Sequence, residues 1–273
     1  MHSTFPQLQV VALDALVLHE EADGDRVERL RRQLESSGIL RNPPIAAPLE
    51  AGRFVLLDGA TRVTALRTLG CRTAVVQVVD YPGTAVTLRT WAHFLPQWSL
   101  DELQQQAVSA GFRTHRISLA EAQRALAERT IIAYATSDGT YALGLQSSSP
   151  APTAVLLRRL VSLYTGRGFQ RVTAEEVSLL RQHSAQAAGL SIVFPDFTPE
   201  EIRRMALAGE KLPAGITRHI IAGRLLQANI PVEELRRVRT PEEQYRWLQH
   251  WWHERLRSHR LRYYPEPTFV LEE

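Results

Sequence analysis

The clearest pattern of apolar and polar positions lies at residues 54–70, FVLLDGATRVTALRTLG. Phe54 to Leu57 is an apolar run with the length of a buried strand. After Asp58-Gly59, apolar residues recur at helical spacing as far as Leu69, and Gly70 stands where a glycine commonly ends a helix. The pattern predicts a strand, a sharp turn and a helix.

This motif is the centre of a predicted α+β unit between residues 9 and 80. Turn residues and helical or strand-like spacing divide the stretch into short elements. The predicted order is a strand at 9–18, a helix at 26–37, strands at 45–48 and 54–57 joined by a turn at 50–52, the helix after Gly59, and a strand at 74–79.

From residue 81 onward the chain mixes helical and strand patterns. Capping-box sequences predict helices that begin near Ser99, Ser118, Thr198 and Thr240. The other predicted elements are a hairpin over 130–145 that turns at Ser137-Asp138-Gly139, a helix at 154–164, strands at 190–194 and 216–221, and an extended tail at 261–271. We therefore expect an α+β protein with an N-terminal domain at 1–82 and a mixed α/β domain at 83–273 that closes over a cleft.

Composition narrows the class of protein. The chain is 44% hydrophobic with a formal charge of +3 and no long Lys/Arg run, so a nucleic-acid partner is not required and a phosphorylated small molecule fits as well. The single cysteine, Cys71, excludes an intramolecular disulfide and a cysteine-built zinc site. The N-terminus lacks a signal-peptide pattern, and no apolar segment approaches the roughly 20 residues of a membrane helix. We expect a cytoplasmic protein with no membrane partner.

The Asp58-Gly59 turn is the first candidate for chemistry. A strand that turns through glycine into a helix directs the first free N–H groups of the helix at whatever lies above the turn, and these groups favour an anion. Arg62 adds a positive charge in the first helical turn. The motif fits a phosphate-binding site, and it also fits an ordinary structural turn, since Asp-Gly before a helix is common in strand-to-helix connections.

His19-Glu20-Glu21, just past the first predicted strand, is the second candidate. A carboxylate at a strand end can act as a general base or metal ligand if it faces a cleft, and otherwise it is a solvated loop residue. The residues alone do not choose between Glu20 and Glu21.

The third candidate is Pro213-Ala-Gly-Ile-Thr-Arg-His219, where Thr217, Arg218 and His219 follow each other. A guanidinium suits a carboxylate or phosphate. In a strand, Thr217 and His219 would share one face and Arg218 would point to the other. The alternative is a buried strand with an arginine at its edge.

Residues 9–80, with the DGATR loop at 58–62, resemble the ParB/sulfiredoxin fold. Sulfiredoxins need a cysteine in this loop where the chain has Ala60, so that activity is not expected. Chromosome-partition ParB proteins carry Glu and Arg where this chain has Ala60 and Thr61, and they continue into a helix-turn-helix domain that the pattern after residue 81 does not predict.

A third branch of this fold, the SbnI-like free-serine kinases, is similar to nearly the whole chain. The similar segments are LHE at 18–20, LRNPP at 40–44, LLDGATR at 56–62, TWAHFLP at 90–96 and GEKLPAGITRHIIAGR at 209–224. The resemblance implies transfer of a phosphoryl group from ATP or ADP to the hydroxyl of free L-serine, with Mg²⁺, giving O-phospho-L-serine. It implies Glu20 as base, Asp58 as a catalytic and metal-binding residue, and a nucleotide site at Arg41, Asn42, Asp58, Gly59, Ala60, Thr61 and Arg62. The implied serine-binding residues are Trp91, Thr217, Arg218 and His219.

One position departs from the family pattern. The family loop usually reads D-G-x-H-R, and this chain has Thr61 in place of the histidine. A threonine hydroxyl can donate a hydrogen bond to a phosphate, but it carries no positive charge. The alternative function is a nucleotide- or effector-sensing DNA-binding regulator without kinase activity, which a continuous basic stripe on one face would favour.

Overall fold

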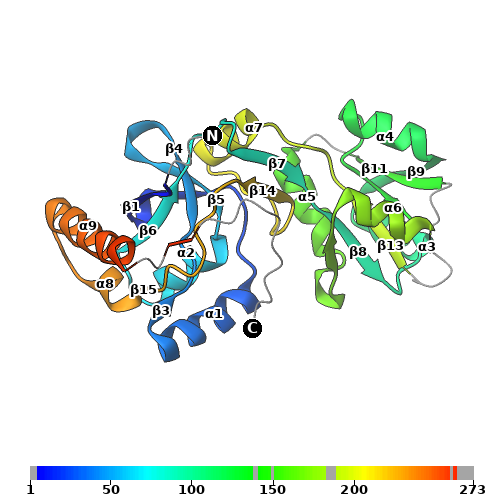
Figure 1. Cartoon of the computed structure of the whole chain (residues 1–273). Helices are drawn as coiled ribbons and strands as arrows, with labels where there is room; N and C mark the ends of the chain where they lie inside the picture. The colour runs from blue at the N-terminus through cyan, green and yellow to red at the C-terminus, as the bar shows by residue number, and fades with distance from the viewer. Residues whose placement is uncertain (1–4, 138–140, 149–150, 183–188, 259–260, 263–273) are drawn as a thin grey trace. The chain divides into compact units, whose positions relative to one another are not determined.

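A computed structural model describes residues 5–137, 141–148, 151–182, 189–258 and 261–262. The predicted turn residues Asp138 and Gly139 and the predicted tail beyond residue 262 lie outside this part of the chain. The described chain forms two compact units, coloured along the chain in Figure 1. The first unit contains the residues up to Leu16, Gly24–Ala85 and the chain from Ile221 onward, and the second contains Val17–Asp23 and Val86–Ile220.

The first unit is built on a five-stranded sheet with the order β1-β6-β4-β5-β2. β4 pairs with β5 as an antiparallel hairpin and with β6 in parallel, while β6 also pairs antiparallel with β1. The strands are β1 (Gln7–Ala12), β2 (Leu16–Leu18), β4 (Ile45–Pro48), β5 (Phe54–Asp58) and β6 (Thr73–Val78). Val55, Ala74, Val75 and Val76 are fully buried, so the middle of this sheet forms the core of the unit.

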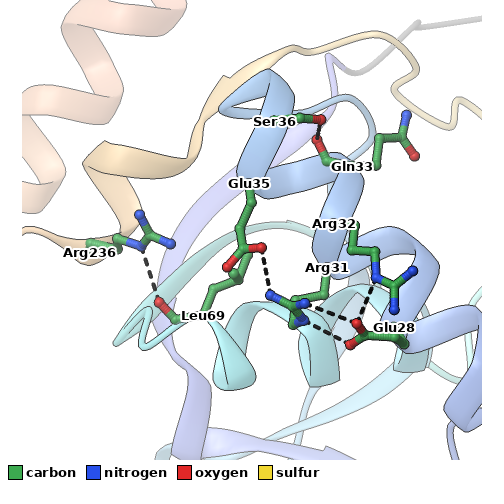
Figure 2. A network of polar contacts seen from close by, with 8 residues as sticks. All are labelled: Glu28, Arg31, Arg32, Gln33, Glu35, Ser36, Leu69 and Arg236. Atoms are coloured by element: carbon green, nitrogen blue, oxygen red, sulfur yellow. Dashed lines mark hydrogen bonds and ion pairs between the residues drawn. The ribbon is translucent and has the colours of Figure 1, made fainter.

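Helices α1 (Gly24–Ser37) and α2 (Ala60–Thr68) pack against each other beside this sheet. Later segments complete the unit: β15 (Ile230–Pro231) pairs with β3 (Ile39–Leu40), α8 (Val232–Arg236) contacts β6, and α9 (Pro241–Arg257) contacts β1. Figure 2 shows one contact between α8 and the end of α2, in which the guanidinium of Arg236 donates a hydrogen bond to the carbonyl of Leu69, 3.1 Å away. Such a cation satisfies a carbonyl that the helix itself leaves unpaired.

The second unit is built on a six-stranded sheet with the order β12-β8-β13-β10-β11-β9, in which every neighbouring pair is antiparallel. The strands are β8 (Ala92–Pro96), β9 (Phe112–Ser118), β10 (Ala133–Thr136), β11 (Tyr141–Ser147), β12 (Gln170–Val172) and β13 (Gly189–Val193). A separate pair, β7 (Val86–Thr90) and β14 (Thr217–Ile221), forms a two-stranded sheet. The helices are α3 (Leu100–Ser109), α4 (Leu119–Ala127), α5 (Thr153–Ser162), α6 (Ala174–Gln182) and α7 (Pro199–Leu207).

Several predicted elements are confirmed. The strand, glycine turn and helix at 54–69 form as expected, and Ser118, Thr198 and Thr240 each make a complete capping box. The single strand predicted at 9–18 is wrong, because a short 3-10 turn at Leu13–Ala15 divides it into β1 and β2. Leu13 is buried there, and its N–H donates to the carbonyl of Arg72 instead of continuing a ladder.

The two units differ from the continuous domains expected from the sequence. Residues from Ile221 onward were expected in the second domain, whereas the structure groups them with the first unit. Across the described residues, no helix has the length and apolar character needed to cross a bilayer.

Candidate active site

In the second unit, the carboxylate of Glu20 is the centre of a polar cluster. Its segment runs beside Leu212, through a parallel bridge to Glu20 and a hydrogen bond from the N–H of Glu21 to the carbonyl of Leu212. Oε2 accepts from the backbone N–H of Gly215 at 3.1 Å. Oε1 accepts both from the N–H of Thr217 and from its hydroxyl, which lies 2.6 Å away. The backbone before β14 therefore holds both oxygens of the carboxylate.

The neighbouring Glu21 has a different environment. Its Oε1 lies 2.6 Å from Nε of Arg158, and both side chains are more than one-third exposed. A solvent-exposed ion pair of this kind contributes little to stability. The geometry therefore separates the two carboxylates that the sequence left as alternatives: Glu20 faces Thr217, and Glu21 faces the surface.

The hydroxyl of Thr217 connects Glu20 to a buried histidine. Nε2 of His19 lies 2.8 Å from Oγ1 of Thr217. Since a carboxylate only accepts, the hydroxyl hydrogen goes to Glu20, and Nε2 of His19 must donate to the hydroxyl oxygen. His219 stands edge-on to His19 with ring centroids 5.3 Å apart.

Arg218 lies on the other face of β14, as the alternation predicted. Thr217 and His219 are buried and Arg218 is partly exposed. The Arg218 guanidinium carbon lies 4.4 Å from the ring centroid of Trp91, in a cation–π contact. The structure thus brings Thr217 to Glu20, places His219 beside His19, and brings Arg218 to Trp91 on the other face of β14.

In the first unit, the Asp58-Gly59 turn opens α2. Gly59 has a φ of 105° and no side chain caps the helix. A Cβ on Gly59 would lie 3.1 Å from both Nε of Arg62 and Cβ of Pro44, so glycine suits both the backbone angle and the space. The N–H groups of Ala60, Thr61 and Arg62 occupy the uncapped first turn, where an anion is favoured.

The side chain of Arg62 is engaged in the fold. Nη1 donates to the carbonyls of Asn42 and Pro43 at 3.1 and 2.8 Å, and Nη2 lies 2.6 Å from Oδ2 of Asp58. Its side chain is only 19% exposed. Arg62 therefore stabilises the loop before β4 against the turn before α2.

A second arginine, which the sequence analysis did not single out, reaches the same carboxylate. Nη2 of Arg224 lies 3.0 Å from Oδ2 of Asp58, and the Arg224 side chain is 35% exposed. Gln77 on β6 accepts from the N–H of Leu225 and donates to the carbonyl of Gly223, which fixes the backbone on both sides of Arg224. Arg224 ends the segment at 209–224 that carried the family resemblance, and this is the only signal in the sequence that marked it.

The remaining predicted nucleotide residues lie around this turn. The carbonyl of Arg41 accepts from the N–H of Asn229, and Oδ1 of Asn42 accepts from the N–H of Gln227 at 2.8 Å. The chain at 227–229 therefore fixes the loop that contains Arg41 and Asn42. Thr61 is partly exposed.

Asp58 was also the predicted metal ligand. Within the described residues, no three His, Cys, Asp or Glu side chains gather closely enough to enclose a metal ion. Asp58 instead neutralises two guanidiniums. Mg²⁺ commonly uses one or two protein carboxylates together with substrate phosphates and water, so this single carboxylate fits a cation that arrives with a nucleotide.

Comparison with known proteins gives relatives for most of the chain. No family model matches. The chain is 26% identical over 250 residues to the ATP-dependent L-serine kinase SbnI of Staphylococcus aureus, covering 91% of this chain and 92% of that protein. It is 29% identical over 83 residues to an ATP-dependent L-serine kinase of Staphylothermus marinus, which covers 30% of this chain and 33% of the relative.

Solved structures share the fold. SbnI with a C-terminal truncation matches with a TM-score of 0.72 at 23% identity, covering 91% of this chain and 97% of that one. A free serine kinase in complex with AMP matches with a TM-score of 0.73 at 18% identity, covering 85% and 95%. The resemblance to SbnI-like serine kinases that the motifs indicated is confirmed, and the fold is a mixed α and β fold.

Proposed function

We propose that this protein, which is similar over most of its length to the SbnI-like kinases, phosphorylates free L-serine. It would transfer a phosphoryl group from ATP or ADP to the serine hydroxyl and release O-phospho-L-serine. The observation that carries the proposal is the carboxylate of Glu20, which the backbone before β14 holds by three hydrogen bonds.

In this proposal Glu20 is the general base. An ionised carboxylate has about four acceptor positions, two on each oxygen. Thr217 occupies two positions on Oε1, and Gly215 occupies one on Oε2. The serine proton therefore goes to Oε2 as the serine Oγ attacks the terminal phosphorus, and the bond from that phosphorus to the leaving nucleotide oxygen breaks. Thr217, whose hydroxyl donates to Glu20, is the nearest candidate to orient serine, with His219 on the same face of β14. Trp91 and Arg218, the other proposed serine-binding residues, pair on the opposite face of β14, so Arg218 would contact serine only through the end of its long side chain.

The nucleotide would bind to the first unit, for which we propose the ParB/sulfiredoxin-like topology. Its phosphates would accept hydrogen bonds from the uncapped N–H groups of Ala60, Thr61 and Arg62 above Gly59. Arg224 would supply the mobile positive charge, because its side chain is 35% exposed, nearly twice the 19% of the more extensively bonded Arg62. Mg²⁺ bound to Asp58 and the phosphates would neutralise the charge that develops on the transferred group. Arg41 and Asn42 would border this site.

The charge on helix α1, which is rich in arginine, does not favour the alternative of a DNA-binding regulator, because acidic side chains pair with Arg31 and Arg32. Figure 2 shows that Arg31 of α1 is paired with Glu28 and Glu35, and that Arg32 is paired with Glu28. These pairs lower the pKa of Glu28 to about 2 through hydrogen bonds from Arg31 and Arg32, so the carboxylate stays charged and offsets them. A phosphate backbone requires uncompensated positive charge.

The direct test is to incubate the purified protein with Mg²⁺, L-serine and either ATP or ADP, and to detect O-phosphoserine by mass spectrometry. Glu20→Gln should lower kcat by about 10²- to 10⁴-fold, because an amide cannot take the proton. Glu21→Gln is the matched control, one residue away and on the surface, and should retain the parental rate. Absence of O-phosphoserine with both nucleotides refutes the activity, and a Glu20→Gln rate within a few-fold of the parent refutes the base.

A further inference from the structure

A chain of buried polar groups lies behind Gly215, within the second unit. Nε2 of His93, on β8, is 3.0 Å from the carbonyl oxygen of Gly215, and Nδ1 is 2.8 Å from the hydroxyl of Tyr164. His93 and Tyr164 are both fully buried. Neither was assigned a role in binding or catalysis by the sequence, and neither contacts Glu20.

The direction of each hydrogen bond follows from the chemistry of the groups. Burial lowers the pKa of His93 to about 4, against the opposing effect of its bond to Gly215, and the charge of Arg171 lowers it further. Burial also raises the pKa of Tyr164 well above its usual value. A carbonyl only accepts, so the neutral imidazole donates Nε2–H to Gly215 and its Nδ1 accepts from the hydroxyl of Tyr164.

The ring of His93 is held in one orientation. Phe169 stacks on it with centroids 4.0 Å apart, and Phe194 stands edge-on at 4.9 Å. With the ring plane fixed by packing and Nδ1 fixed by Tyr164, the Nε2–H bond has a defined direction. Packing and hydrogen bonds together therefore fix both the position and the orientation of the imidazole.

Gly215 connects this buried group to Glu20. Its carbonyl accepts from His93 while its N–H donates to Oε2 of Glu20, the oxygen that receives the serine proton in the proposed function. Gly215 has a φ of 84°, and a Cβ there would lie 1.9 Å from Nε of Arg171. The backbone at this position is therefore clamped between His93 and Arg171.

We propose that His93, oriented by Tyr164, is a positioning residue for the carboxylate of Glu20. It holds the carbonyl of Gly215, and thereby fixes the N–H of Gly215 that sets the direction of Oε2. This inference rests on the proposed role of Glu20 as base. Displacement of a reacting group by about 1 Å can cost about 10²-fold in rate, so this support acts on turnover more than on binding.

The kinetic test compares His93→Phe, His93→Gln and Tyr164→Phe. His93→Phe keeps an aromatic ring but removes the donor, and kcat should fall by roughly 10-fold or more while nucleotide affinity stays within twofold. His93→Gln can still present an N–H to Gly215 and should recover part of that loss. Tyr164→Phe should give a smaller loss, because the donor remains but its ring loses one restraint.

A double-mutant cycle separates positioning from a general effect on the fold. In the Glu20→Gln background, where no base remains to be positioned, His93→Phe should change kcat by less than twofold. A further loss as large as in the parent background overturns the proposal. So does a kcat for His93→Phe that equals that of the parent.

A second measurement does not depend on activity. In ¹⁵N–¹H spectra the amide of Gly215 should shift when Glu20→Gln removes the carboxylate, and it should shift again in His93→Phe or, if that variant does not fold, in Tyr164→Phe. The amide of Gly59 in the first unit is the control for intact folding. If the parent makes no O-phosphoserine, the proposed function is refuted, but this spectrum still tests whether His93 positions Gly215. A Gly215 amide that does not shift in a folded variant overturns the positioning role.

Discussion

Acid should destabilise this protein through His93. The pKa of this buried imidazole is about 4, against 6.5 for an ordinary histidine, because burial disfavours the charged form. The unfolded chain therefore binds more protons between these values, so this contribution to stability is complete above pH 6.5 and is lost as the pH falls toward 4. Between pH 7.5 and 5.0 the loss is about 2 kcal/mol, and below pH 4 it reaches about 3 kcal/mol, at 1.36 kcal/mol for each pH unit.

Urea unfolding at pH 7.5 and 5.0 measures this contribution as a difference between proteins. Between pH 7.5 and pH 5.0, the decrease in the free energy of unfolding should be about 2 kcal/mol larger for the parent than for His93→Gln. Tyr164 and Arg171, the groups beside His93, do not change charge over this range, and the remaining carboxylates act equally in both proteins. His115→Gln, which removes an exposed histidine from β9, should keep the parental dependence. Equal pH dependence for the parent and His93→Gln would refute the reasoning.

Three further predictions follow from the sites. Arg62→Ala should lower the free energy of unfolding by about 1–3 kcal/mol in urea titrations, because two carbonyls and Asp58 lose a part-buried donor, while Arg224→Ala should lower nucleotide affinity in calorimetry and leave stability nearly unchanged. The reverse pattern would contradict these assignments. Arg218→Ala should raise the serine KM in steady-state assays without changing nucleotide affinity, and a change confined to nucleotide affinity would place Arg218 in the other half of the reaction. Gly215→Ala should cost more than 1 kcal/mol of stability and most of kcat, whereas Gly24→Ala, which meets nothing within 4 Å, is the control and should cost neither.

The features that the sequence predicted well are local ones. The capping boxes at Thr198 and Thr240 depend only on residues three positions apart, and both form as predicted. The strand, turn and helix around Gly59 likewise depend on spacing within a dozen residues. The alternation of Thr217, Arg218 and His219 across β14 was also correct, because strand geometry alone dictates it.

The features that the sequence missed depend on contacts between distant positions. Glu20 and Thr217 are separated by 197 positions, and His93 and Gly215 by 122. Nothing in the residues near Glu20 indicates that Thr217 will hold it, so the residues alone left Glu20 and Glu21 as alternatives and only the family resemblance favoured Glu20. The return of the chain from Ile221 to the first unit was missed for the same reason, since it is set by pairing and packing with residues near the N-terminus.

The turn at Asp58 shows how contacts in the structure change the role expected for a charge that the sequence marks. The sequence places Arg62 beside a backbone turn for which we propose phosphate binding, but two carbonyls and Asp58 already hold its guanidinium in a largely buried position. Removing such a group from its partners would leave two carbonyls without this donor, which costs free energy. Arg224 has a longer ion pair and greater exposure, and a nucleotide phosphate can replace Asp58 as its partner. That exchange would leave Asp58 paired with Arg62 and open a position on the carboxylate for Mg²⁺, so the metal-binding role predicted for Asp58 would depend on an arginine more than 160 positions away.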